Sequence, residues 1–181
     1  KMNKKITIEN AVINFANLAQ PSTYDGKPSK YDLTMRFNKD SKAGQVLETA
    51  VESILRDNNN PELLDQYDKL AFKDGNNSDY SVNHDHWILK ANSNTQVPCY
   101  DRNKSLLSLN EIQAKAGRGA TVNAIVTLWY QDNEYGQRVN CVLNGVQIVK
   151  ACNVESFFSN LDYDSDDFSS VDYDKYDSDD F

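Results

Sequence analysis

The chain has 181 residues, 39% of them hydrophobic, which is enough for one globular core. Its formal net charge is −8 and belongs to the C-terminal end, because residues 160–181 contain nine Asp and one Lys, whereas residues 1–159 contain 18 acidic and 18 basic residues. No segment has the length of a membrane span or the apolar centre of a signal peptide, so we expect a protein of the cytoplasm that does not enter a membrane.

The first third of the chain predicts two strands separated by a loop. Residues 6–18 mix β-branched and polar side chains, as a strand does, and residues 21–30 contain the Asp-Gly and Pro signals of a loop. Residues 30–37 alternate between apolar and polar side chains, which is typical of a half-buried strand. Lys30 and Arg36 share the polar side of that strand, opposite Tyr31.

Two helices and a loop are predicted in the middle of the chain. Residues 41–57 place apolar side chains at helical spacing, and Asp40 or Ser41 can cap the helix. A short helix begins after Pro61, and residues 73–85 have the composition of a polar loop.

The second half predicts three further strands. They cover residues 86–92, 120–130 and 137–150, and the last two are joined by a hairpin. Residues 96–105 form a connection, followed by a short helix in which Ser108 and Glu111 have capping-box spacing and Gly117 is the stop. About five strands with added α-helices predict a small, mainly β domain, closed or sandwiched, over residues 1–159.

The sequence gives little support to an enzyme. Cys99, Cys141 and Cys152 are an odd number without CxxC spacing, which favours reduced thiols, and the chain lacks GxSxG, P-loop and HExxH motifs. The alternative of a Mg²⁺-dependent nuclease would use scattered aspartates, and a metal could bind the "HDH" segment at 84–86. Exposed histidines explain that segment more simply, so we expect no catalytic residues, no metal and no cofactor.

Aromatic residues interleaved with basic ones are a stronger signal. Single-stranded nucleic acid is bound by stacking bases on aromatic rings while Lys and Arg follow the phosphates. The candidate stacking residues are Trp87, Tyr100 and Trp129, and the candidate phosphate contacts are Lys30, Arg36, Lys90, Arg102, Lys104, Arg118 and Arg138. Each aromatic residue has core packing as its alternative; Trp129 and Tyr130 point to opposite sides of one strand, and the sequence leaves open which is exposed.

The C-terminal end carries a duplicated acidic peptide. "YDSDDF" occurs at 163–168 and again at 176–181, and residues 160–181 have a composition that cannot bury a core, which predicts a disordered acidic tail. A repeated Asp-Asp-Phe suits a basic groove beside an apolar pocket, as a recognition peptide would. The candidate partner-binding residues are Asp166, Asp167, Phe168, Asp179, Asp180 and Phe181.

Taken in order, several segments resemble a known family. They are "GKPSKYDLTMRF", the helix at 41–56, "YDRNKSLL", "GRGATVNAIVTLWY", "VLNGVQIVK" and the terminal "DSDDF". The chain is similar to the single-stranded DNA-binding proteins of tailed phages, which have one OB-fold and an acidic C-terminal tail ending in Phe. The resemblance spans most of the chain.

The resemblance implies an OB-fold barrel and non-specific binding of single-stranded DNA in phage DNA replication and recombination. It also implies a tail that competes for the DNA groove and contacts phage DNA polymerase and helicase-primase, and it implies a homodimer. The neutral core departs from the basic core that the family leads one to expect. The alternative hypothesis is a protein-interaction scaffold in which the acidic tail is the functional part and the core binds no DNA.

Overall fold

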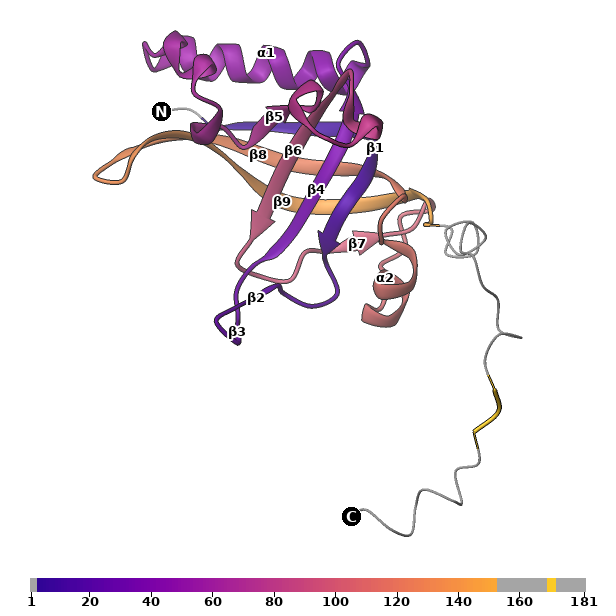
Figure 1. Cartoon of the computed structure of the whole chain (residues 1–181). Helices are drawn as coiled ribbons and strands as arrows, with labels where there is room; N and C mark the ends of the chain where they lie inside the picture. Colours follow the sequence, from indigo (N-terminus) through magenta and orange to yellow (C-terminus); the bar gives the residue numbers. More distant parts are fainter. Residues whose placement is uncertain (1–2, 153–168, 172–181) are drawn as a thin grey trace.

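A closed β-barrel forms the centre of the molecule (Figure 1). The computed structural model describes residues 3–152 and 169–171. Within these residues the barrel consists of β1 (Lys4–Asn17), β4 (Tyr31–Asn38), β6 (His86–Ser93), β8 (Thr121–Asn133) and β9 (Gly136–Lys150). The strands are hydrogen-bonded in the order β6-β4-β1-β8-β9, and a parallel pairing of Asn92 with Val142 closes β9 on β6.

The barrel strands alternate between the core and the outside. Ile13, Met35 and Leu89 are paired across β1, β4 and β6, and all three are completely buried. The same alternation in β8 buries Val122, Ala124, Val126 and Leu128. The order of the strands is that of an OB-fold, so the predicted mainly β barrel is confirmed.

Helix α1 (Lys42–Asp57) covers one end of the barrel, at the top of Figure 1. Of the two predicted caps, Ser41 is the one used: the backbone N–H of Gly44 donates to its Oγ over 3.2 Å. The buried face of the helix, which includes Leu47, Val51 and Ile54, packs as predicted from its periodicity.

Helix α2 (Leu109–Lys115) begins with the predicted capping box. Ser108 Oγ accepts from the N–H of Glu111, and the Glu111 carboxylate accepts from the N–H of Ser108. Together with β7 (Cys99–Tyr100), this helix lies at the opposite end of the barrel from α1 (Figure 1).

The segments predicted as loops, and the short helix predicted after Pro61, contain additional short elements. These are β2 (Thr23–Tyr24), β3 (Lys27–Pro28), β5 (Phe72–Asp74) and β7, with the 3₁₀ turns η1 (Pro61–Asp65), η2 (Tyr67–Lys69), η3 (Gly75–Asn77) and η4 (Ser81–Asn83). The segment after Pro61 is therefore 3₁₀ rather than α-helical. β5 pairs with β6 and widens the sheet beyond the barrel.

The three cysteines are free thiols, as predicted. Burial raises the pKa of Cys99 to about 11 and that of Cys141 to about 12, so both stay protonated at neutral pH. Among the described residues, no helix combines the length and the apolar character that crossing a membrane requires. The six candidate partner-binding residues, from Asp166 to Phe181, lie outside the described residues.

Candidate nucleic-acid interface

The outer surface of β1, β4 and β6 carries two rows of side chains that cross the sheet. One row joins Phe15, Thr34 and Lys90, and these residues are paired through the registers of β1 with β4 and of β4 with β6. Because Ile13, Met35 and Leu89 point into the barrel, the residues of this row point away from it. An exposed aromatic ring and an ammonium group therefore share one face of the sheet.

The second row runs parallel to the first. It joins Val12, Arg36, Ile88 and Lys73 through the registers that link β1, β4, β6 and β5. It brings the predicted Arg36 into line with Lys73, a basic residue that the sequence analysis missed because β5 was read as part of a loop.

Phe15 was also missed, and a β-bulge is the reason. The pairing of β1 with β4 shifts between Ile13 and Phe15, so Asn14 is an extra residue on β1. Simple alternation would place Phe15 on the same side as Ile13, in the core. The bulge instead turns Phe15 outward, where its side chain is 59% exposed.

A groove of about 560 Å³ lies over the line where the barrel closes between β6 and β9. Three of the predicted residues meet in it: Lys30, Lys90 and Trp129 line its walls. The rest of the lining is mostly polar and includes Lys73, Asn92, Gln131 and Asn140. Trp129 is thus the outward-facing residue of the pair that the sequence left open, whereas Tyr130 packs against the core.

Arg138 lies at the margin of this groove. It pairs with Gln131, a residue of the groove wall, and its guanidinium donates to the carbonyl oxygen of Asp68 over 2.9 Å. The groove therefore combines one indole ring with ammonium groups and one guanidinium at its edge.

Arg36 and Arg118 form a second basic cluster on the outer face of β4 and β1. Arg36 is half-buried, and its Nη1 donates to Asn14 Oδ1. Desolvation, followed by the like charge of Arg118, lowers the pKa of Arg36 from its ordinary value. Neither guanidinium forms an ion pair with a carboxylate of the described residues. An anion between them would relieve their repulsion, which suits a phosphate group.

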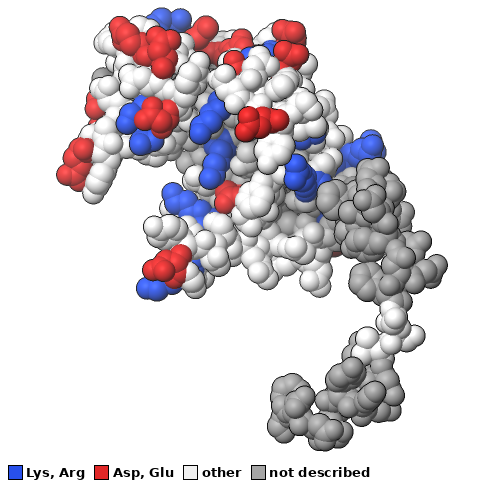
Figure 2. Space-filling view, in the orientation of Figure 1, with Lys and Arg blue, Asp and Glu red and all other residues white. Residues whose placement is uncertain are grey.

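The surface charge is divided accordingly. Figure 2 shows Lys and Arg side chains across the middle of the face that carries β6 and β4, while Asp and Glu side chains gather at the top, where α1 lies. The neutral sum over residues 1–159 thus conceals an uneven distribution, with Lys and Arg concentrated near β6 and β4 and Asp and Glu concentrated near α1.

Three predicted residues lie elsewhere. Tyr100 is in β7, and Arg102 and Lys104 are exposed in the turn that follows it. This turn is held against β9 by Gln147, whose Nε2 donates to the carbonyl of Arg102 over 3.4 Å. β5 and β7 lie at opposite ends of the line where the barrel closes: β5 pairs with β6 at Ile88, before the closing pair of Asn92 with Val142, and β7 pairs with β9 at Gln147, beyond it. None of the three residues lines the groove, so the structure does not bring this group together with Lys90.

Trp87 is separated from the groove as well. It lies on the side of β6 opposite to Lys90, and its ring meets Phe72 edge to face with centroids 5.5 Å apart. The Lys39 ammonium lies 4.6 Å from the ring centroid, and the indole N–H donates to Glu48 on α1 over 2.9 Å. Trp87 therefore attaches α1 and β5 to the barrel, and its role as a stacking residue has no geometric support here.

The described residues contain no group of three or more His, Cys, Asp or Glu side chains placed to hold a metal ion. In the "HDH" segment, the two imidazoles form hydrogen bonds with backbone carbonyls, of Ser78 and of His84. Asp32 accepts from Asn17, and Asp101 accepts from the backbone of the turn after β7, so these carboxylates serve separate local structures.

The family model described as "Enterobacter phage Enc34, ssDNA-binding protein" matches residues 4–181. The chain belongs to this family. Membership in the Enc34 family makes it a phage single-stranded DNA-binding protein, in agreement with the resemblance inferred from the sequence. A comparison with curated proteins gives no match.

Solved structures share the fold of this Enc34 family member. The single-stranded DNA-binding protein of bacteriophage Enc34 in complex with ssDNA is 24% identical with a TM-score of 0.69, and the match covers 82% of this chain and 88% of that one. A second structure of the Enc34 protein has the same identity and TM-score and covers 90% and 88%. The gp2.5 single-stranded DNA-binding protein of bacteriophage T7 is 13% identical, with a TM-score of 0.60 and coverage of 89% and 98%.

Proposed function

We propose that this protein binds and protects single-stranded DNA without sequence preference during phage DNA replication and recombination in the host cytoplasm. The observation that carries the proposal is the shared outward face of Phe15, Lys90 and Arg36, continuous through Lys90 with the groove of Trp129. Ammonium and guanidinium groups contact phosphates and aromatic rings contact base faces. Every nucleotide has both, so such a surface binds all sequences alike.

The acidic tail supplies a second part of the proposal. Residues 160–181 have a net charge of −8 and compete with DNA for the Lys and Arg side chains near β6 and β4, and DNA displaces them. The displaced Asp-Asp-Phe motifs recruit replication proteins such as polymerase and helicase-primase, with Phe181 as the main anchor. As the sequence resemblance implies, we also propose that the protein forms a homodimer.

Fluorescence anisotropy of labelled oligo-dT tests both parts. The full-length protein and a chain ending at Asn160 are titrated at two salt concentrations. We expect tighter binding by the shorter chain and weaker binding of both at higher salt, because counterions compete for the phosphates. Equal affinities at low salt would contradict competition by the tail. If neither chain bound oligo-dT, the protein would instead be a scaffold whose tail is the functional element.

The two tryptophans are expected to have opposite phenotypes. Trp129→Ala should weaken oligo-dT binding by about 1–3 kcal/mol, the value of one base stack, with little change in the thermal midpoint. Trp87→Ala should lower the free energy of unfolding by roughly 2–3 kcal/mol, below the range for fully buried tryptophans because Trp87 is half-buried. Anisotropy and thermal denaturation of both variants measure these effects, and a Trp87→Ala protein of normal stability but weak binding would reverse the assignment.

A further inference from the structure

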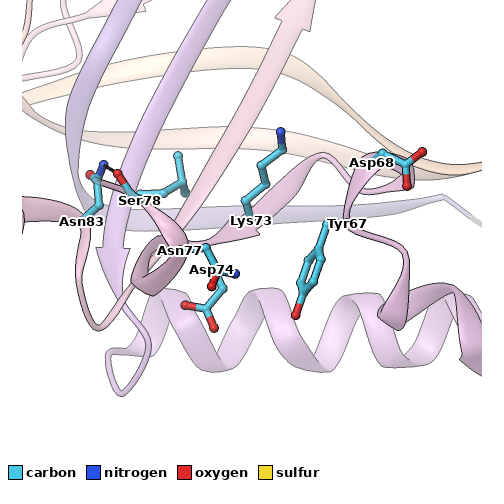
Figure 3. Close-up of a pocket in the computed structure, with 8 residues that line it drawn as sticks. Tyr67, Asp68, Lys73, Asp74, Asn77, Ser78 and Asn83 are labelled. Carbon is cyan, nitrogen blue, oxygen red and sulfur yellow. Dashed lines mark hydrogen bonds between the residues drawn. The ribbon is translucent and has the colours of Figure 1, made fainter. Parts of the chain in front are cut away.

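A second pocket, of about 480 Å³, adjoins the groove on the outer side of β5. Its volume lies in the range of small-molecule sites. Asp68 and Lys73 line both cavities, so the pocket is a lateral extension of the groove. Figure 3 shows Tyr67 and Asp68 at one end, Ser78 and Asn83 at the other, and Lys73 between them.

The pocket offers flat, apolar surfaces. Tyr67, in η2, is 55% exposed, and its ring makes no aromatic contact with another described residue. The half-buried side chain of Ile88 contributes a second apolar wall, next to the stem of Lys73 with which it is paired. An exposed aromatic ring is a surface on which a planar heterocycle stacks, and the aliphatic lining adds further apolar contact area.

Charge distinguishes which part of a nucleotide fits. The carboxylate of Asp74 lines the pocket but not the groove, and it disfavours a phosphate there. The Asp74 carboxylate is 2.7 Å from Lys39 Nζ, and this hydrogen bond is the main reason why its pKa is lowered, so it stays ionised. A neutral base is therefore the better occupant, while the phosphates follow the basic groove outside.

Ser78, at the far end of the pocket, and Lys73, in its middle, can both donate hydrogen bonds. Ser78 Oγ accepts hydrogen bonds from Asn83 Nδ2 over 2.9 Å and from the N–H of Tyr80 over 3.2 Å. With both acceptor positions occupied, the hydroxyl proton is left to donate. Lys73 can only donate, and its ammonium has no ion pair with a described residue.

The donor end is held in place by a hydrogen-bonded chain. Asn14 Nδ2 donates to Asn83 Oδ1 over 3.0 Å, and Arg36 donates to Asn14 Oδ1, so Ser78 is connected through two asparagines to the Arg36 cluster. The backbone at Gly75 approaches the carbonyl of Asn83 so closely that a Cβ there would collide with it. The pocket wall is thus preorganised and linked to the phosphate-binding face.

We propose that this pocket takes one base of the bound single strand, stacked on Tyr67, with its exocyclic carbonyl accepting from Ser78 and Lys73. This inference rests on the proposed binding of single-stranded DNA. At this one position it predicts a preference for thymine, guanine or cytosine over adenine, which has no carbonyl, while the rest of the surface binds all sequences alike.

The test compares base-bearing and abasic strands of the same length, about 16 nucleotides, which is near the largest site of one OB-fold. Tyr67→Ala should bind oligo-dT about 5- to 100-fold more weakly than the wild type and bind the abasic strand equally well. Tyr67→Phe, which keeps the ring, should resemble the wild type. The matched control is Tyr80→Ala, because Tyr80 is 67% exposed and lines neither cavity.

An unchanged affinity of Tyr67→Ala for oligo-dT would overturn the inference, and so would an equal loss on both strands, since the effect would then not involve a base. In either case binding of oligo-dT by the wild type would leave the proposed function standing. If the wild type bound neither strand, the proposed function would fail, and the base pocket with it.

A second variant tests the carbonyl preference. Ser78→Ala should reduce the ratio of the affinities for oligo-dT and oligo-dA several-fold, whereas Ser81→Ala, in the neighbouring turn, should leave this ratio unchanged. Using a ratio removes any general weakening caused by the loss of the Ser78 contacts with Asn83 and Tyr80. An unchanged ratio in Ser78→Ala would refute the role of its hydroxyl as a donor to the base.

Discussion

Replacing Arg36 and Arg118 together with Gln is expected to weaken oligo-dT binding roughly 100-fold at low salt. Each charge-assisted hydrogen bond to an anion contributes about 1.5–3 kcal/mol, and the exposure of Arg118 places the combined effect at the low end. Glutamine at position 36 keeps a polar amide donor on the face of β4 but removes the positive charge. Anisotropy at several salt concentrations measures the loss.

The salt dependence makes this prediction specific. Each phosphate contact to a single strand contributes about 0.7 to the magnitude of the slope of log affinity against log salt. The slope of the double variant should therefore be smaller in magnitude by about 1.4. Arg56→Gln is the control, because Arg56 is an exposed arginine in the last turn of α1, on the acidic side of the molecule. A double variant with the slope of the wild type would mean that the two guanidinium groups do not contact phosphates.

Leu47→Ala is expected to lower the free energy of unfolding by about 2–5 kcal/mol, the range for a fully buried leucine. Leu47 lies at the centre of the face that α1 presents to the barrel and is completely buried. The variant leaves a cavity between the helix and the strands, and the thermal midpoint should fall by several degrees for each kcal/mol. Below the new midpoint, oligo-dT affinity should be unchanged, since α1 lies away from the groove.

Thr49→Ala is the matched control for this variant. Thr49 is exposed on the same helix, and alanine has the better helix propensity, so its stability should change by less than about 0.5 kcal/mol. Denaturant titration of both variants distinguishes burial from propensity. A loss in Thr49→Ala equal to that in Leu47→Ala would contradict the packing of α1 described above.

The five barrel strands could be predicted because their pattern is locally consistent. Over residues 33–37 of β4 and 122–128 of β8 every second residue is apolar and buried, and in α1 the apolar spacing and the Ser41 cap agree with each other. Short elements such as β5 and β7 have no such pattern. They form because β6 and β9 offer unpaired edges, which only the assembled sheet provides.

The candidate site was predicted only in part, for two physical reasons. Arg36, Lys90 and Trp129 could be found because each follows the alternation of a regular strand, and Lys30 immediately precedes β4. Phe15 could not, because the bulge at Asn14 reverses the alternation, and Trp87 looked suitable because its packing partners, Phe72 and Glu48, lie far from it in the sequence. Contacts between residues that are far apart in the sequence decide whether an aromatic ring is exposed for base stacking or packed within the fold.

The closure of the barrel has a consequence for its dynamics. β6 and β9 share a single residue pair, Asn92 with Val142, supplemented by Ala71, whose N–H donates to Val139 and whose carbonyl accepts from Lys90. β8 and β9, in contrast, are paired along their whole length. The line between β6 and β9 should therefore open first in local unfolding, with the fastest amide exchange of the barrel. A strand of DNA bound in the groove over that line would contact both β6 and β9. The DNA-saturated protein should therefore show slower amide exchange along these strands and a higher thermal midpoint than the free protein.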